Sequence, residues 1–261
     1  MRFFRAAILI CLCAGTAGPG LRGEPGIFAQ WNPVWTTAPV RGAGAPLVGN
    51  GTLFSTVWLG PNGGLNWEIQ RRDVALKLGT CLLQTGGGFD SGDATLDLWN
   101  GELRGSVTSE RGEVGYLTYA VSDPSVIVIE LTHRREGGMV LAWMPAFHTP
   151  VPHVIVTPGE VSAVQLLQAG GRAVAVVQRR IDSRPDHQGY VIAIEPGASS
   201  AAALAAASAI AERAALLGPR ELLAAHRSQW HRAYRDNVPM TAAERAFWLQ
   251  RYQSLSLGLN P

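Results

Sequence analysis

The segment from Pro46 to Asp73 decides the fold, and it reads Pro-Leu-Val-Gly-Asn-Gly-Thr-Leu-Phe-Ser-Thr-Val-Trp-Leu-Gly-Pro-Asn-Gly-Gly-Leu-Asn-Trp-Glu-Ile-Gln-Arg-Arg-Asp. Its Gly-Asn-Gly corner and its Pro-Asn-Gly-Gly turn both accept the backbone conformations of chain reversals. Leu53 to Leu59 has the length of a strand, and Leu65 to Ile69 alternates apolar and polar side chains with a period of two. We therefore predict a β-hairpin with one face in the core.

Short runs of strand length continue from this hairpin to about residue 195. We count about eleven or twelve strands, separated by turn residues at the spacing of a β-sandwich. Asn100-Gly101 is predicted to be a two-residue hairpin turn. The most apolar run, Val126 to His133, is predicted to lie at the centre of a sheet. The predicted fold class is mainly β, with a large sandwich over residues 24–197.

The composition changes after Pro196-Gly197, where the sequence becomes rich in alanine. Ser199 and Ser200 can cap a helix that runs from Ala201 to Leu217. Gly218-Pro219 is predicted to end this helix and to begin a second one. Residues 198–237 are therefore predicted to form a helical linker.

A last helix is predicted in residues 238–261, because Thr241-Ala242-Ala243-Glu244 is a capping box. Its apolar face carries Phe247, Trp248 and Tyr252 and needs a partner. The helix could fold back on the sandwich, or it could be the first helix of a helical domain absent from this chain.

Composition excludes several classes of function. The chain has 261 residues and a formal net charge of +2, and it has no basic stripe of the kind that binds nucleic acid. The glycine run at residues 86–88 lacks the Gly-Lys-Ser/Thr that follows in a phosphate loop. The cysteines and histidines lack the spacing of a zinc site. We predict no cofactor and no bound metal.

Residues 1–23 have the pattern of a secretory signal peptide: Arg2 and Arg5 precede a short apolar run and a small-residue cleavage site. A lipoprotein signal around Cys13 is the alternative. No later segment is expected to span a membrane, so the mature protein is predicted to be secreted or periplasmic. Cys81 then stands alone, and its leucine neighbours predict a buried thiol rather than a nucleophile.

The order of these elements resembles a known architecture. Pro46-Leu47-Val48-Gly49-Asn50-Gly51, then Val57-Trp58 and a hairpin ending near Asp73, resembles the start of bacterial α-L-fucosidase-like glycoside hydrolases of family 95 and of a related uncharacterised group. Residues 226–234 resemble the helical linker of those proteins, and residues 246–255 resemble the first helix of their (α/α)6 barrel. Val48 is a minor departure, because the pattern often has Leu-Gly-Asn-Gly directly.

The resemblance implies a large β-super-sandwich, a short helical linker and one further helix, with most of the barrel absent. In that family the catalytic acid and base come from the barrel, so no catalytic residue carries over to this chain. The implied function is that of a non-catalytic N-terminal domain that supports or caps a carbohydrate site, with a glycan or oligosaccharide as partner.

Five residues are candidates for carbohydrate binding, each with a structural alternative. Asn50 could bind sugar hydroxyls, or the corner could serve backbone geometry alone. Trp58 could stack on a sugar ring, although most of the eight tryptophans are expected in the core. Asp73, with Glu68, could line a site or form an ion-paired strand end. His148 and His153 lie in a proline-rich loop that could line a cleft or be plain surface.

Three functional hypotheses remain open from the sequence. The first, the N-terminal domain just described, predicts an exposed apolar face on Phe247, Trp248 and Tyr252. The second is a sugar-processing enzyme of the mutarotase type, which predicts a histidine and a carboxylate converging in one concave pocket. The third is a non-catalytic glycan-binding or structural module, which predicts binding without turnover.

Overall fold

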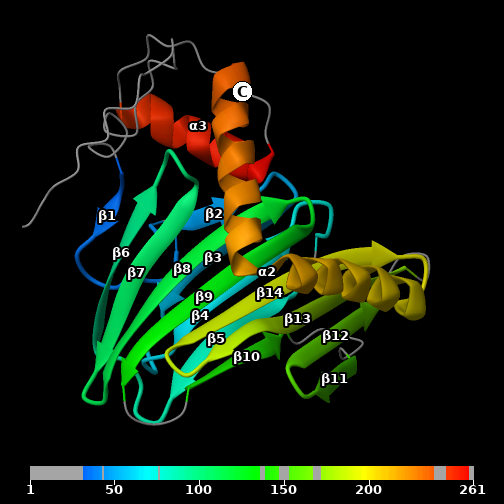
Figure 1. The fold of residues 1–261 in the computed structure, drawn as a ribbon, viewed down its shortest axis with the longest axis horizontal. Coiled ribbons are helices and arrows are strands. Elements are labelled where there is room, and N and C mark those ends of the chain that lie inside the picture. Colours follow the sequence, from blue (N-terminus) through cyan, green and yellow to red (C-terminus); the bar gives the residue numbers. More distant parts are fainter. Residues whose placement is uncertain are drawn as a thin grey trace, which may run out of the picture.

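The computed structural model describes residues 32–42, 44–75, 77–135, 139–146, 153–166, 172–237 and 245–258. These residues form fourteen strands and two helices, which confirms the mainly β fold class (Figure 1). All strand pairs are antiparallel, and the strands form two sheets. The nine-stranded sheet has the order β1 (Val34–Trp35), β6 (Ser91–Asp97), β7 (Glu102–Ser109), β8 (Gly112–Ser122), β9 (Ser125–Arg135), β14 (His187–Gly197), β13 (Ala173–Arg184), β12 (Glu160–Leu166), β11 (His153–Thr157). The five-stranded sheet has the order β10 (Met139–Pro145), β5 (Gly79–Thr85), β4 (Leu65–Arg71), β3 (Leu53–Leu59), β2 (Leu47–Gly49).

The predicted opening hairpin is confirmed as β3 and β4 of the five-stranded sheet, and one of its faces lies in the core. Leu53, Val57 and Trp67 are fully buried there. The Trp67 indole N–H donates a 2.8 Å hydrogen bond to Thr118 Oγ1 on the opposite sheet. Tyr116 meets the same indole edge-on, with ring centroids 5.9 Å apart. The hairpin therefore joins the two layers at their centre.

The strand predicted to be central is also confirmed, because β9 lies in the middle of the nine-stranded sheet. The predicted two-residue turn at Asn100-Gly101 was wrong. Asp97 pairs with Glu102, so the connection between β6 and β7 has four residues, 98–101. The Asp97 carboxylate accepts hydrogen bonds from the backbone N–H groups of Trp99 and Asn100, which stabilises this longer loop.

The predicted linker helix is α2 (Ser200–Asn237), which covers part of the outer face of the nine-stranded sheet (Figure 1). The Ser199 hydroxyl accepts a 3.2 Å hydrogen bond from Ala202 N–H, as expected for a helix cap. Gly218 has non-helical backbone angles and separates two helical halves, as predicted. The first half presents a row of buried alanines to β13 and β14: Ala203, Ala207, Ala211 and Ala214.

The expectation that no segment after the signal is long and apolar enough to span a membrane was wrong, because Ser200–Ala233 has that length and composition. In the structure the helix breaks at Gly218, and its alanine face packs against the sheet. We therefore interpret it as the cover of the sheet.

The second half of α2 docks on the loop between β6 and β7. Arg227 donates hydrogen bonds of 2.6 and 3.1 Å to the buried Glu102 carboxylate. His231 stacks on Trp99, with ring centroids 4.4 Å apart. The Trp230 indole lies against Gly101, where a Cβ would overlap it. The part of the sequence that resembles a linker thus fits one specific loop of the sandwich.

The last helix, α3 (Arg245–Leu257), folds back on the corner formed by residues 49–51. Gly51 N–H donates a 3.0 Å hydrogen bond to the Ser256 carbonyl, and a Cβ at Gly49 would overlap the same oxygen. Tyr252 is fully buried. The expectation of an exposed face is therefore wrong at Tyr252, because this corner covers it. The side chains of Phe247 and Trp248, the signal peptide and the capping box lie outside the described residues.

Candidate functional site

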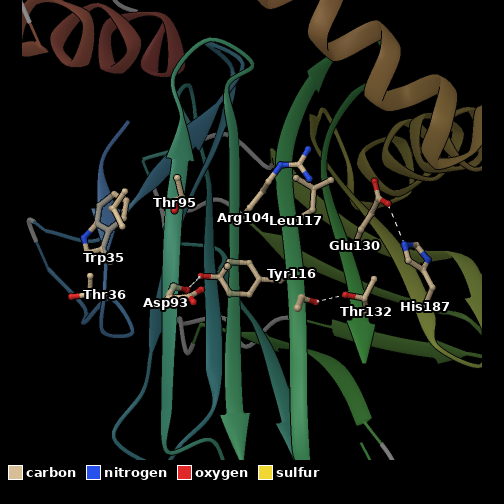
Figure 2. Close-up of a pocket in the computed structure, with 13 residues that line it drawn as sticks. Trp35, Thr36, Asp93, Thr95, Arg104, Tyr116, Leu117, Glu130, Thr132 and His187 are labelled. Atoms are coloured by element: carbon tan, nitrogen blue, oxygen red, sulfur yellow. Dashed lines mark hydrogen bonds and ion pairs between the residues drawn. The ribbon is translucent and has the colours of Figure 1, made fainter. Parts of the chain in front are cut away.

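A groove of about 780 Å³ lies on the outer face of the nine-stranded sheet, where α2 leaves it uncovered (Figure 2). We call it the nine-strand groove. Strand register builds its floor, because Thr95 pairs with Arg104, Arg104 with Leu117, and Leu117 with Glu130. Facing residues in antiparallel strands point to the same side of the sheet. Four neighbouring strands thus present one row of side chains to the groove.

A hydrogen-bonded network forms one wall of the groove. His187 Nε2 lies 3.2 Å from Glu130 Oε2, and the Tyr119 hydroxyl donates a 2.9 Å hydrogen bond to Glu130 Oε1. His187 Nδ1 lies 3.0 Å from Asp182 Oδ2, an ion-pair distance without the alignment of a hydrogen bond. Burial and the Glu130 carboxylate raise the pKa of the Tyr119 hydroxyl, so it remains a donor. Both oxygens of Glu130 therefore have partners within the protein.

The buried carboxylate of Glu102 supports the nine-strand groove through Arg104. Glu102 is fully buried and lies between Arg104, which lines the groove, and Arg227 of α2. Burial opposes ionisation of Glu102, but hydrogen bonds from Arg227 and Arg104 outweigh it and lower its pKa. Glu102 thereby holds the Arg104 guanidinium, while the Arg104 side chain remains half exposed. The linker helix and the groove share this one carboxylate.

Apolar and aromatic groups complete the nine-strand groove. Trp35 lies at one edge, and its indole N–H donates a 3.0 Å hydrogen bond to the Gly44 carbonyl. Tyr116, whose ring packs against Trp67 in the core, also lines the groove, and Gly105 leaves room for its hydroxyl, which a Cβ there would overlap. That hydroxyl donates a 3.1 Å hydrogen bond to the Asp93 carbonyl. The arrangement of an aromatic edge beside polar side chains suits a ligand that is rich in hydroxyl groups.

A second groove, of about 930 Å³, lies on the outer face of the five-stranded sheet. We call it the five-strand groove. Trp58 lines it, and the Arg41 guanidinium lies over the Trp58 ring, 5.3 Å from its centroid. Arg41 and Lys77 both pair with Glu68, at 3.0 and 2.6 Å. The two grooves are therefore on opposite outer faces of the sandwich.

Asn50 makes three hydrogen bonds to the backbone of the protein. Its amide N–H₂ donates a 2.6 Å hydrogen bond to the Val121 carbonyl, and its Oδ1 accepts from the N–H groups of Thr52 and Leu53. It also borders a cavity of about 120 Å³ beside α2, which is far smaller than either groove. These bonds join the corner to the nine-stranded sheet.

The other sequence candidates do not come together. Trp58 lies in the five-strand groove, while the Asp73 carboxylate is mostly exposed at a strand end and pairs with Arg71 at 2.7 Å. His153 is exposed on β11, and His148 lies outside the described residues. Carbohydrate binding by these five residues stays a prediction. Two structural expectations are confirmed: Cys81 is buried, and Glu68 is ion-paired.

Sequence reasoning missed the residues that the nine-strand groove assembles, namely Arg104, Glu130 and His187. Only Glu130 could have been noticed in the sequence, because it is the one charged residue in the apolar run of β9. The described residues contain no group of three or more His, Cys, Asp or Glu side chains that could hold a metal ion.

No protein-family model matches the chain, and no curated protein sequence matches it. Among solved structures, it is similar to a protein assigned as a kojibiose phosphorylase from the human microbiome, with a TM-score of 0.56 and 9% identity over 80% of this chain and 36% of that chain. A bacterial glucoamylase complexed with acarbose matches with a TM-score of 0.46 and 8% identity, over 86% of this chain and 44% of that one. A family 92 α-mannosidase from Bacteroides thetaiotaomicron, in complex with mannoimidazole, matches with a TM-score of 0.38 and 10% identity, over 85% of this chain and 38% of that one.

The chain therefore spans less than half the length of each of these three structures. At such identities the likeness concerns the fold. The match to the phosphorylase-type protein shows that this chain shares the fold of the matched part of that protein.

Proposed function

We propose that this chain is the non-catalytic β-sandwich domain of an exported glycoside hydrolase-like protein of the family 95 type. In this proposal the nine-strand groove binds a neutral glycan or oligosaccharide. The proposal rests on the related fold, on the order of sequence motifs, and on the chemistry of the groove.

The internally paired network in the groove wall is the observation that carries the proposal. Glu130 accepts from Tyr119 and pairs with His187, whose other nitrogen faces Asp182. A general acid or base needs an atom that reaches the substrate. Because both Glu130 oxygens and both His187 ring nitrogens already face partners, this wall favours recognition over bond cleavage. Arg104, Thr95 and Thr132 remain to donate or accept hydrogen bonds to hydroxyl groups.

Titration of the purified protein with a panel of neutral oligosaccharides, followed by calorimetry, tests this proposal. Thr132→Arg places a long side chain in the groove from an exposed position, and we expect it to weaken binding at least about tenfold. Thr157→Arg is the matched control, because Thr157 is also exposed on a strand of the same sheet. Each of the two hydroxyls makes only a 3.5 Å hydrogen bond. Failure of the whole panel to bind, or equal binding by the two variants, would contradict the proposal.

A mutarotase-type activity is the second candidate, because a histidine and a carboxylate do converge in one concave groove. His187 and Glu130 both line it and lie 3.2 Å apart. An enzyme of this type would speed the exchange of sugar anomers, which NMR follows directly. If the wild-type protein accelerates this exchange and Glu130→Gln abolishes the acceleration, this candidate replaces the non-catalytic proposal. We expect the rate to equal that of buffer alone.

A further inference from the structure

The five-strand groove differs from the nine-strand groove in its charge. Two carboxylates, Asp93 and Glu130, line the nine-strand groove together with Arg104 and His187. The described residues that line the five-strand groove include two cations, Arg41 and Lys77, and no acidic side chain. The two faces of the sandwich therefore offer different chemistry to a ligand.

One carboxylate beneath the five-strand groove pairs with both of its cations. Glu68 is buried, and its two oxygens divide between Arg41 and Lys77. Burial opposes ionisation of Glu68, but Lys77 and Arg41 outweigh it and lower its pKa. A guanidinium group has five N–H donors, so Arg41 can serve a ligand as well as Glu68.

The Arg41 guanidinium is oriented before any ligand arrives. It lies over the Trp58 ring, 5.3 Å from the centroid, and its Nη2 is 3.0 Å from Glu68 Oε2. The Arg41 side chain is nevertheless 61% exposed. Trp58 itself is buried, and its ring holds the Arg41 guanidinium in place. A planar guanidinium held in this way is suited to a carboxylate, which it can bind through two parallel hydrogen bonds.

Neutral hydrogen-bonding groups surround the two cations. The groove is also lined by Asn62, Asn66, Thr80 and Gln84. Amides and hydroxyls of this kind recognise sugar hydroxyls, whereas the two cations recognise acid groups. A volume of about 930 Å³ accommodates more than one sugar ring.

We propose that the five-strand groove is a second saccharide site, selective for sugars that carry a carboxylate, such as uronic acid residues. Arg41 and Lys77 bind the carboxylate, and Trp58 positions Arg41. This site is separate from the neutral-glycan groove of the proposed function, and the two stand or fall independently.

Calorimetric titration with an oligogalacturonide, and with its methyl ester of the same length, tests the proposal on the unmodified protein. The free acid is expected to bind at least about tenfold more tightly than the ester, which lacks the charge. Equal affinities would overturn the proposal. Poly-glutamate is the second comparison ligand, and binding as tight as that of the oligogalacturonide would show a general response to polyanions instead.

Variants of the groove residues test where the oligogalacturonide binds. Arg41→Gln and Lys77→Gln are each expected to weaken oligogalacturonide binding at least about tenfold. Arg213→Gln is the matched control, because Arg213 is 59% exposed and pairs with Asp123 as Arg41 pairs with Glu68. Equal losses in Arg41→Gln and Arg213→Gln would overturn the assignment of the site. Thr132→Arg, which blocks the nine-strand groove, should leave this binding unchanged.

Discussion

The ring of Trp230 lies nearly parallel to the ring of Tyr252, at an interplanar angle of 10° and a centroid distance of 5.3 Å. Trp230 belongs to α2 and Tyr252 to α3, so this stack joins the two helices. Trp230 also lies against Gly101, in the loop between β6 and β7. The linker, the last helix and the sandwich thus meet at one aromatic pair.

Gly101→Ala should destabilise the protein because a Cβ there overlaps the Trp230 indole. Gly101 also has a φ of 66°, which costs an alanine about 1–2 kcal/mol. The overlap should add about 1–3 kcal/mol. Urea unfolding of Gly159→Ala provides the control, because Gly159 has a φ of 80° and open space around it. If both variants lost the same free energy of unfolding, the overlap with Trp230 would not contribute to the destabilisation.

Glu102→Gln should lower the free energy of unfolding by about 1–3 kcal/mol, because it weakens hydrogen bonds to two charged arginines. Asp123→Asn is the comparison, since the exposed pair of Asp123 and Arg213 should contribute only about 0–1 kcal/mol. Urea unfolding at neutral pH measures both. A loss in Glu102→Gln no greater than in Asp123→Asn would show that the linker is held mainly by its aromatic contacts.

The same glutamate gives an acid-dependent stability. The pKa of Glu102 in the folded protein lies below its ordinary value of 4.5. Its contribution is therefore present above that value and is lost as the pH falls through the folded pKa. Between neutral pH and strong acid, wild type should lose more stability than Glu102→Gln. If the free energy of unfolding fell equally with pH in the two proteins, this assignment would be contradicted.

His226 gives a pH dependence at a higher pH. Burial lowers its pKa below the ordinary value of 6.5, and its Nδ1–H donates a 2.9 Å hydrogen bond to the Ala120 carbonyl. Below 6.5 the unfolded chain binds a proton that the folded chain does not, so stability falls as the pH falls. The slope is at most about 1.4 kcal/mol per pH unit. His226→Phe should flatten this slope between pH 7 and 5, whereas His153→Phe, at an exposed position, should not.

Cys81 should report unfolding. Burial raises the pKa of its thiol far above the ordinary value, and the thiol donates a 3.3 Å hydrogen bond to Gln178 Oε1. Because the thiolate is the reactive form, a thiol reagent should modify Cys81 only when the chain unfolds. A Cys11→Ser, Cys13→Ser double variant leaves it as the single thiol. Rapid modification in native buffer would show that the sheets separate locally.

The sequence predicted those parts of the fold that local chemistry determines. Leu53 to Leu59 became a strand with the predicted bounds, because its turns and its alternation act within a few residues. Gly218 broke the linker helix for the same reason. The loop after Asp97 was not predicted, because the carboxylate of one residue set its length.

The nine-strand groove could not be predicted in this way. Glu130 and His187 are 57 residues apart and meet only because β9 pairs with β14 in one register. A shift of one residue would turn each side chain to the opposite face. The five sequence candidates followed motifs instead, and motifs here mark turns and strand ends rather than one shared surface.

The closure of the 49–51 corner by α3 has a consequence for the order of folding. The Tyr252 hydroxyl donates a 2.7 Å hydrogen bond to the Leu47 carbonyl across 205 positions of sequence. During synthesis the amino-terminal part leaves the ribosome first and begins to fold before later residues exist. The opening hairpin must therefore wait, with its corner uncovered, until α3 has been made. The corner next to the first strands is therefore covered only after the last helix has been synthesised.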